Sequence, residues 1–524
     1  MLQSRQEKDK ALKNEFNNAL NINNENLLKI LKDNEGTAFG KEHSFTSIKS
    51  AKEFVNKVPL SDYKTYKDIA EEPQKYTVYP INSRLATSGS TGNQKFFPLS
   101  EEALNRYSTH VLDMPNNLSN LSGNILHTNV FRSPVDGVTI LSRAYFKALV
   151  SSGRYDFSEF IGGTDFTFCE NVVDVNYMKA YIALSSPNVE AFQSIFLYDL
   201  AMFFSYIEKN WRTILSDVEN KKFSVDLPTD IKEKLIALSP SEEWLKRAEK
   251  EFSLGFDNIV PRLWTKVKFV GGIGGKMYRF QERALVRFIG DIPVHYSIYA
   301  SSECMMGISP YLKPILSSAE YVLMPRNAYY EFIPKKGKRA IPMSKLAIGG
   351  EYEPVITTFS GLYRYKMGDI LKVSGFVGQS PVFEMVGRRA LVIDIAGEKI
   401  DSFTATEAVE RLSVKTGITL RDFAIGIDTR IMPSGYLLFY EGENSDKKFD
   451  INLEFDNILK ELSPDYKELR DLEMINKPKV LPVGFGEIFN SISVAAKVSH
   501  EKPRIFINEY ATDYLLERSD KNGK

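Results

Sequence analysis

Residues 354–376 read Pro354-Val-Ile-Thr-Thr-Phe-Ser-Gly-Leu-Tyr-Arg-Tyr-Lys-Met-Gly-Asp-Ile-Leu-Lys-Val-Ser-Gly-Phe376. Two runs rich in β-branched and aromatic residues flank a turn at Gly368-Asp369, which is typical of strands. Similar short runs closed by glycine recur between residues 266 and 390, as in KVKFVGG, VHYSIYASSE and KLAIGG. Because helical patterns are mixed with these strands, this part of the chain predicts an α/β fold with layers around a sheet.

The segments on both sides extend this pattern. Residues 10–75 carry helical spacing and predict a helical N-terminal layer. Helical patterns also dominate residues 100–265, and one of them extends from Ala191 to Val218. Its most apolar stretch, Ala191 to Ile207, we interpret as a buried helix, because polar residues interrupt it too early for a membrane span. The glycine cluster Gly271 to Gly275 lacks the spacing of a dinucleotide fingerprint and indicates a strand-to-helix turn.

A different pattern begins after residue 390. We expect a helix at Thr404 to Thr416, strands at Asp422 to Thr429 and Gly435 to Gly442, a helix at Phe449 to Leu462, and then a polar tail. A chain of 524 residues is too long for one compact core. We therefore predict two α/β domains, a large one at residues 1–386 and a smaller one at residues 387–524.

Charge and cysteine content narrow the class of partner. Lysine plus arginine (67) balances aspartate plus glutamate (67), so no global positive field favours nucleic acid or an anionic membrane. We expect small-molecule partners bound in a local pocket. Only Cys169 and Cys304 occur, and no secretory signal is visible at the N-terminus, so we expect a reducing cytoplasmic location. The oligomeric state is not predicted.

The strongest local motif is Thr87-Ser-Gly-Ser-Thr-Gly-Asn-Gln-Lys95, which follows a strand-like segment at Tyr76 to Ala86. Glycines expose backbone N–H groups, hydroxyls donate further hydrogen bonds, and the lysine adds a positive charge, so such a loop can bind phosphate. It is not a Walker loop, because GxxxxGK followed by serine or threonine is absent. A flexible polar turn is the alternative.

Two later motifs suggest a nucleotide site. Ser297-Ile-Tyr-Ala-Ser-Ser-Glu303 ends a probable strand, where Tyr299 is suited to border a base and Ser302 to reach a phosphate. Glu303 offers a carboxylate for Mg²⁺, although a helix cap is the alternative. Asp369 follows a glycine at a turn and is placed to accept ribose hydroxyls, or is only a turn residue. Cys304 we interpret as a packing residue.

Taken in order, the motifs SGSTGxxK, YASSE, YKMGD and GRxxxxIxxxGxKID resemble the adenylate-forming superfamily of acyl-CoA synthetases, luciferases and peptide-synthetase adenylation domains. Further stretches resemble one branch, the auxin-responsive acyl acid amido synthetases. They include Phe54-Val-Asn-Lys-Val-Pro59, Met324-Pro-Arg-Asn-Ala-Tyr-Tyr-Glu-Phe-Ile-Pro334 and Leu362 to Phe376. The resemblance extends from about residue 20 to residue 510.

This resemblance implies an adenylation domain that binds ATP and Mg²⁺, followed by a mobile C-terminal domain with its hinge near residues 387–390. It implies three groups of site residues. Ser88, Gly89, Ser90, Thr91 and Lys95 would contact phosphates. Tyr299, Ser302, Asp369 and Arg388 would surround the nucleotide, with Glu303 on the metal. Arg143, Tyr329 and Phe332 would contact the acid. A lysine assisting adenylation is placed at Lys502, with Lys497 as the alternative.

The function implied is ATP-dependent activation of a carboxylic acid as acyl-AMP, followed by transfer to an amine, in particular an amino acid, to form an amide. One alternative is a ligase that forms a thioester with coenzyme A or a carrier. A second alternative is a protein that binds the acid or the nucleotide without catalysis. The sequence does not specify the acid or the amine.

Overall fold

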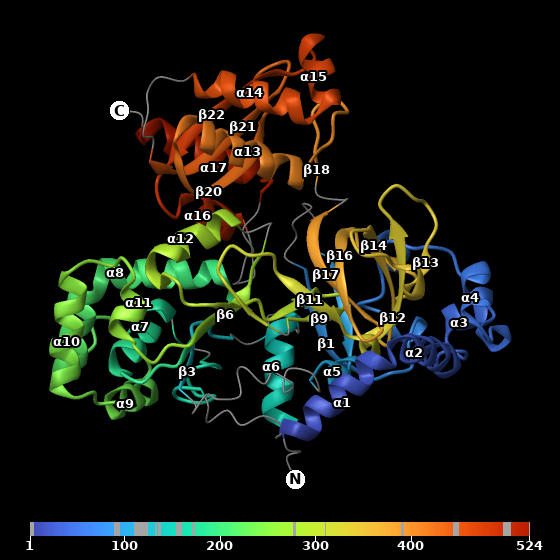
Figure 1. Ribbon diagram of the computed structural model, residues 1–524, viewed down its shortest axis with the longest axis horizontal. Coiled ribbons are helices and arrows are strands. Elements are labelled where there is room, and N and C mark those ends of the chain that lie inside the picture. Colours follow the sequence, from blue (N-terminus) through green and yellow to red (C-terminus); the bar gives the residue numbers. More distant parts are fainter. Residues whose placement is uncertain are drawn as a thin grey trace.

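The computed structural model describes residues 5–87, 95–108, 124–131, 134, 138–152, 160–169, 172, 174–275, 279–309, 311–388, 392–443, 450–495 and 505–522. Residues up to 388 form a broad lower part, and the rest of the chain forms a smaller part above it (Figure 1). Both parts combine helices with sheets, so the predicted α/β class is confirmed.

A largely parallel sheet forms one half of the lower part, in the order β10-β7-β6-β5-β3. Parallel neighbours require crossover connections, and helices supply them between successive strands. The strands are β3 (Ile125–His127), β5 (Ala191–Phe196), β6 (Phe269–Ile273), β7 (Val294–His295) and the antiparallel β10 (Leu312–Lys313). The helices of this half are α6 (Leu141–Ser152), α7 (Val175–Ser185), α8 (Leu197–Asn220), α9 (Thr229–Ala237), α10 (Glu242–Ser253), α11 (Ile259–Leu263) and α12 (Arg279–Ile289).

An antiparallel sheet forms the other half, in the order β13-β12-β14-β16-β17-β11-β9-β8, with β15 (Tyr365–Lys366) paired to β14. Its strands are β8 (Ile298–Ala300), β9 (Met305–Ile308), β11 (Glu320–Leu323), β12 (Ala328–Pro334), β13 (Ile341–Pro342), β14 (Glu351–Thr358), β16 (Asp369–Val377) and β17 (Ser380–Arg388). A further sheet joins β1 (Ile81–Ala86) to β2 (Phe96–Ser100) and β4 (Val138–Thr139).

The predicted helical N-terminal layer is present. It consists of α1 (Arg5–Asn17), α2 (Ala19–Asp33), α3 (Ala38–Glu42) and α4 (Ala51–Lys57), and α5 (Glu101–Ser108) lies next to it. The short 3-10 turn η8 (Pro325–Asn327) contacts α1, α2 and α5. This layer packs against β12 and η8, so residues near the N-terminus support strands more than 270 positions later.

The C-terminal part holds a sheet in the order β20-β21-β22, preceded by a β18–β19 hairpin. Its elements are β18 (Val392–Ile393), β19 (Ile400–Asp401), α13 (Ser402–Thr416), β20 (Thr419–Asp428), β21 (Gly435–Glu443), α14 (Ile451–Leu462), α15 (Pro464–Asp471), β22 (Asn476–Val483), α16 (Glu487–Ala495) and α17 (Glu509–Asn522). Its buried residues form clusters separate from the core of the lower part, which ends at Phe383.

Two sequence interpretations were wrong. Ala191 to Val218 is not one helix, because Ala191–Phe196 is the buried strand β5 and α8 begins at Leu197. A strand buried on both faces has no alternation and resembles a buried helix. The expected polar tail after Leu462 instead contains α15, β22, α16 and α17. Its short apolar runs are completed by pairing with β21 and by packing against α14.

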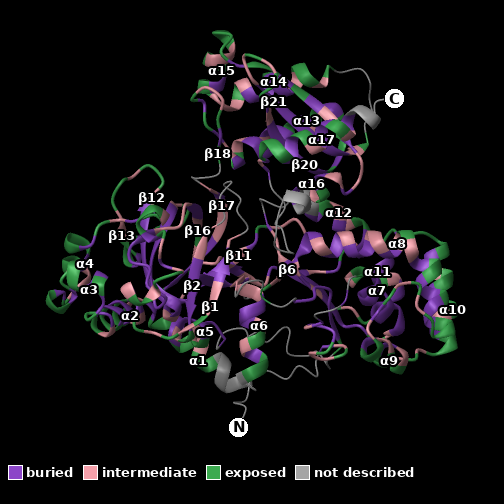
Figure 2. Ribbon diagram, turned by 180° about the vertical axis from the view of Figure 1, so that it is seen from behind, coloured by how far each residue is buried: buried purple, intermediate pink, exposed green. Residues whose placement is uncertain are grey.

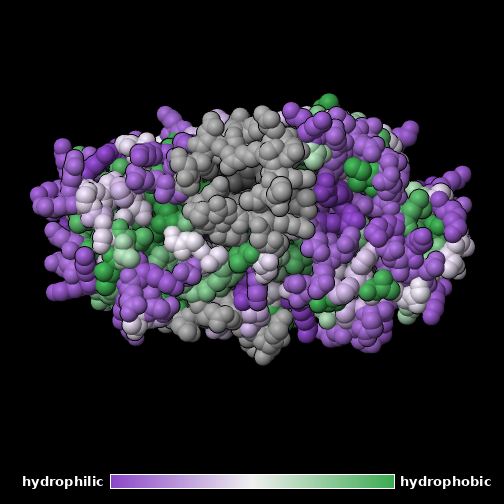
Figure 3. All heavy atoms as spheres, turned by 90° about the horizontal axis from the view of Figure 1, so that it is seen from below, coloured by the Kyte–Doolittle hydropathy of each residue, from purple (hydrophilic) through white to green (hydrophobic). Residues whose placement is uncertain are grey.

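Helices at the surface are amphipathic, with buried sides toward the sheets and exposed sides toward solvent (Figure 2). On the face seen from below, hydrophilic side chains cover much of the periphery and hydrophobic ones are interspersed (Figure 3). Among the described residues, no helix combines the length and apolar character that crossing a membrane requires.

Candidate active site

The predicted phosphate loop joins β1 to β2, which pair antiparallel from Ile81↔Ser100 to Ala86↔Phe96. Two hydrogen bonds close its base: Thr87 N–H donates to the Lys95 carbonyl at 2.8 Å, and Lys95 N–H donates to Thr87 Oγ1 at 3.0 Å. Ser88, Gly89, Ser90 and Thr91 lie outside the described residues. The Lys95 ammonium lies 5.5 Å from the centroid of the Tyr63 ring, a cation–π distance.

The second motif lies beside this loop base. Ser302 Oγ donates to the Ala86 carbonyl at 3.2 Å, so the segment after β8 is attached to the last residue of β1. Glu303 is partly exposed and forms no ion pair within the described part of the chain. The next element is strand β9, so Glu303 does not cap a helix.

Asp369 stands at the centre of the arrangement. It begins β16 opposite Arg388, the last residue of β17. Arg388 Nε donates to Asp369 Oδ1 at 2.5 Å, and the Tyr299 hydroxyl donates to Asp369 Oδ2. Burial, reinforced by the Asp369 charge, holds the pKa of Tyr299 well above its usual value, so this hydroxyl stays a donor. Three residues predicted from separate motifs therefore form one cluster, in which Tyr299 and Asp369 are buried and Arg388 is partly exposed.

The arrangement suits a nucleotide. Each carboxylate oxygen can accept more than one hydrogen bond, so Asp369 can hold hydroxyls in addition to its two protein donors. No group of three or more potential metal-ligating side chains occurs in the described ranges. Glu303 alone nevertheless fits Mg²⁺, which commonly takes one or two carboxylates and completes its shell with phosphate oxygens and water.

Cys304, next to Glu303, is unsuited to nucleophilic catalysis. It is fully buried, and burial raises the pKa of its thiol to about 12. A thiol with that pKa carries almost no thiolate near neutral pH. The interpretation of Cys304 as a packing residue agrees with this environment.

The predicted acid-binding residues are not all brought together. Arg143 of α6 is only 8% exposed, and its buried Nε has no hydrogen-bond partner in the described part of the molecule. Tyr329 and Phe332 stand three positions apart on β12, and successive side chains of a strand alternate between its faces. Tyr329 packs edge-on against Phe54 of α4, whereas Phe332 packs against Tyr352 of β14. One pocket therefore cannot be lined by both rings.

The two candidate lysines, Lys497 and Lys502, lie outside the described residues. The structure describes the residues on either side of the segment that contains these lysines. Helix α16 ends at Ala495, and Ile505 to Ile507 run beside β20, where the Ile425 N–H donates to the Ile505 carbonyl at 2.7 Å.

Family models match three parts of the chain. They are described as the GH3 family N-terminal domain at residues 9–294, the GH3 family central domain at residues 321–388 and the GH3 family C-terminal domain at residues 403–510. The chain belongs to the GH3 family.

Curated relatives of this GH3 chain are named as amido synthetases. Indole-3-acetic acid-amido synthetase GH3.2 of Arabidopsis thaliana is 27% identical over 467 residues, covering 79% of this chain and 83% of that protein. Indole-3-acetic acid-amido synthetase GH3.8 of Oryza sativa subsp. indica is 27% identical over 455 residues, covering 79% and 74%. These relatives agree with the branch that the sequence motifs indicated.

Solved structures with a similar fold identify the fold of this chain. GH3.15 acyl acid amido synthetase superposes with a TM-score of 0.84 at 23% identity, covering 97% of this chain and 95% of that one. A 2-hydroxyisobutyryl-CoA ligase in its postadenylation state matches with a TM-score of 0.53 at 12% identity, covering 94% of this chain and 91% of that one. The adenylate-forming fold that we expected is therefore confirmed.

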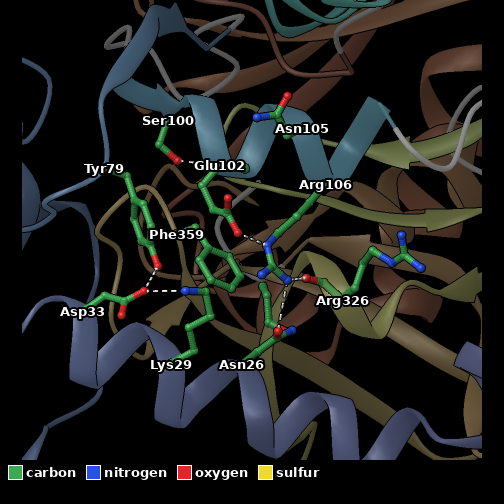
Figure 4. A network of polar contacts seen from close by, with 12 residues as sticks. Asn26, Lys29, Asp33, Tyr79, Ser100, Glu102, Asn105, Arg106, Arg326 and Phe359 are labelled. Carbon is green, nitrogen blue, oxygen red and sulfur yellow. Dashed lines mark hydrogen bonds and ion pairs between the residues drawn. The ribbon is translucent and has the colours of Figure 1, made fainter. Parts of the chain in front are cut away.

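Sequence reasoning missed the supports of this GH3 site. Arg106 of α5 donates to Glu102 at 2.8 Å, to Asn26 of α2 at 3.1 Å and to the Arg326 carbonyl of η8 at 2.7 Å, and lies 3.8 Å from the Phe359 ring centroid (Figure 4). Arg106 thus joins α5 to α2 and to η8, which directly precedes β12. Its contact with Phe359 also joins α5 to the segment before the YRYKMGD motif. No local pattern marks such a residue.

A second support is inside the YRYKMGD motif. Arg364 forms a two-pronged ion pair with Glu331 of β12, with both N–O distances 2.9 Å. It also donates to the Val55 carbonyl at 3.1 Å and the Val58 carbonyl at 2.8 Å, next to α4. The motif thus supplies Asp369 to the site and Arg364 to the scaffold behind it.

Proposed function

We propose that this protein activates a carboxylic acid with ATP as its acyl-adenylate and transfers the acyl group to an amine, in particular that of an amino acid. The observation that carries the proposal is the cluster of Tyr299, Asp369 and Arg388 beside the base of the phosphate loop. GH3 membership and relatives named as amido synthetases support the same reaction.

In the first step, a carboxylate oxygen of the acid attacks the α-phosphorus of ATP, the bond to the bridging oxygen breaks, and pyrophosphate leaves with the electron pair. Negative charge must be neutralised as the reactants approach, so positioning and electrostatics supply most of the catalysis. We assign phosphate contacts to Ser88, Gly89, Ser90, Thr91 and Lys95. We assign the ribose to Asp369, which Arg388 and Tyr299 orient.

Two further assignments belong to this step. Glu303 would hold Mg²⁺, which when bound supplies positive charge at the phosphate oxygens. Lys502, or Lys497 in the alternative register, would place an ammonium near the α-phosphate. Ser302 positions the motif against β1, as its bond to the Ala86 carbonyl indicates.

In the second step, the amine nitrogen attacks the acyl carbon, the bond from that carbon to the phosphate oxygen breaks, and AMP leaves. The nitrogen loses a proton as the amide forms. No enzyme nucleophile is needed, because AMP is already the leaving group. The buried Cys304 thiol, with its raised pKa, plays no part in this step.

For the acid we propose contact with Arg143, whose buried Nε lacks a partner in the described residues. A buried cationic group without a partner is costly, and a polar or anionic oxygen of the acid would satisfy it. Tyr329 and Phe332 remain candidates for the surrounding wall, but only one of the two, because their rings lie on opposite faces of β12. The ring centroids of the neighbouring Phe146 and of Phe131 lie 5.1 Å apart, which gives this region an aromatic character.

We also propose that residues 1–386 and 387–524 move as two domains about a hinge near residues 387–390. The separation of the hydrophobic cores on the two sides of this boundary supports it. Two cysteines that form no disulfide support a reducing location, and we propose the cytoplasm. The balanced net charge supports small-molecule partners over nucleic acid or membrane.

The test is acid-dependent exchange of labelled pyrophosphate into ATP across a panel of aromatic and aliphatic acids. We expect exchange with at least one acid, and an amide product when an amino acid mixture is added. Thioester formation with coenzyme A and no amide would favour the thioester ligase. Absence of exchange with every acid would favour a protein that binds without catalysis.

A further inference from the structure

A tyrosine outside the sequence motifs makes two contacts at the end of the phosphate loop. Tyr63 begins the 3-10 turn η2 (Tyr63–Tyr66), and its hydroxyl oxygen accepts a hydrogen bond of 3.0 Å from the Phe96 N–H. The Lys95 ammonium lies over the same ring, 5.5 Å from its centroid. Tyr63 therefore contacts both the backbone that follows the loop and the lysine side chain that ends it.

The hydrogen bond from Phe96 is made at the edge of a sheet. Strand β2, which begins at Phe96, is an edge strand in the order β2-β1-β4. N–H groups on the outer side of an edge strand have no strand partner. The Tyr63 oxygen supplies a partner for one of them. The end of the loop is thus held on the side that β1 does not cover.

Tyr63 is itself held by the YRYKMGD motif. Two positions earlier, the Ser61 N–H donates to the Arg364 carbonyl, and the Lys366 N–H donates to the Ser61 carbonyl, both at 3.0 Å. The Tyr63 ring also packs edge-on against Phe97 of β2, with ring centroids 5.3 Å apart. The segment that contacts the phosphate loop is therefore attached to the motif that carries the aspartate assigned to the ribose.

The environment of Lys95 leaves its charge available. No carboxylate pairs with the Lys95 ammonium among the residues that the structure describes. An aromatic ring attracts a cation through its quadrupole but does not neutralise it. An ammonium has three N–H donors, so those turned away from the ring can still contact phosphate oxygens. A carboxylate in the place of the ring would instead compete with the phosphates for the lysine.

We propose that Tyr63 is a positioning residue for the binding of ATP. Its ring orients the Lys95 ammonium toward the phosphates, and its hydroxyl holds the backbone at Phe96. This inference rests on the proposed function, because it requires ATP at the loop. A lysine that is already oriented loses less side-chain freedom when the phosphates bind, which strengthens binding. The role acts through Lys95 and needs no contact between Tyr63 and the substrate.

The experiment varies the charge distribution of the ring while its shape stays nearly constant. Tyr63→Phe is the parent variant of the full-length protein, and phenylalanine with one, two or three ring fluorines then takes the same position. Fluorine withdraws negative charge from the ring face, so the cation–π attraction weakens with each step. We expect the Kd for ATP with Mg²⁺, measured by calorimetry, to rise in that order by about two- to fivefold over the series.

Three controls separate this role from packing. Adenosine has no phosphate, so its Kd should stay the same along the series. In Lys95→Met no cation faces the ring, so the series should leave the Kd for ATP unchanged in that background. The same fluorinated residues in place of Tyr510, an exposed tyrosine of α17, are the matched control and should leave the Kd for ATP at its wild-type value.

A Kd for ATP that does not rise with fluorination would overturn the proposal. An equal rise for adenosine, or a rise that persists in Lys95→Met, would overturn it as well. Failure of the proposed function has a different signature. Absence of acid-dependent pyrophosphate exchange in a wild type that binds ATP would contradict the proposed function alone, whereas absence of ATP binding would overturn both.

Discussion

A buried lysine makes stability depend on pH in a calculable way. Lys179 of α7 is 2% exposed, and its ammonium donates a hydrogen bond of 2.6 Å to the Phe166 carbonyl. Burial lowers the pKa of Lys179 from 10.5 to about 7. The Phe166 segment also holds Phe131, whose N–H donates to the Thr167 carbonyl at 2.8 Å, so this lysine supports the region beside α6.

The sign of this pH dependence follows from the number of protons that the folded and unfolded chains bind. Between the folded pKa of about 7 and the unfolded value of 10.5, the unfolded chain binds a proton that the folded chain has released. The free energy of unfolding therefore rises with pH across this window. From pH 7 to pH 9.5 the free energy of unfolding should rise by about 3 kcal/mol. The rise would be about 2 kcal/mol if the folded pKa of Lys179 were one unit higher. Lys179→Met should lack this gain.

Tryptophan fluorescence during urea unfolding measures the difference. Trp244 Nε1 donates to the Leu184 carbonyl at 2.6 Å and Trp264 Nε1 to the Ala183 carbonyl at 3.2 Å, so both rings report on the end of α7. Loss of the hydrogen bond to Phe166 costs Lys179→Met about 1 kcal/mol at both pH values and cancels in the comparison. Equal stability changes with pH in both proteins would refute the reasoning.

Three other predictions concern the site and its scaffold. Arg364→Met should lower the free energy of unfolding by about 3–5 kcal/mol, measured by urea titration, because Glu331 is left buried without its partner; a stability equal to wild type would contradict this. Asp369→Asn should slow acid-dependent pyrophosphate exchange about 100-fold, with the KM for ATP raised, because the ribose loses a charged acceptor; an unchanged KM would place the ribose elsewhere. Lys502→Ala should slow exchange far more than Lys497→Ala, and the reverse order would show that the tail register is wrong.

The fold was predictable where local patterns and three-dimensional roles coincide. Strands β14 and β16 are rich in β-branched and aromatic residues, and α13 is capped by Asp401 and ended by Gly417, so sequence and structure agree there. The boundary at Leu197 was not predictable in the same way. Strand β5 and the start of α8 form one largely apolar stretch with no glycine or proline between them, and only pairing with β3 and β6 marks the strand.

The site was predictable as a set of motifs but not as a set of contacts. The motifs predicted that Tyr299, Asp369 and Arg388 lie close together, and their hydrogen bonds join them. Arg106 and Arg364 carry no such signal. Their partners lie up to 309 positions away, as with Arg364 and Val55, and a single sequence contains no information on such pairs.

These remote supports bear on the proposed adenylation step, because they hold the residues assigned to it. Asp369, Tyr299 and Ser302 are attached to strand ends of the lower part, and Arg364 and Arg106 fix the segments around them through buried polar contacts. Groups held in this way lose little freedom when the nucleotide binds, which favours adenylation.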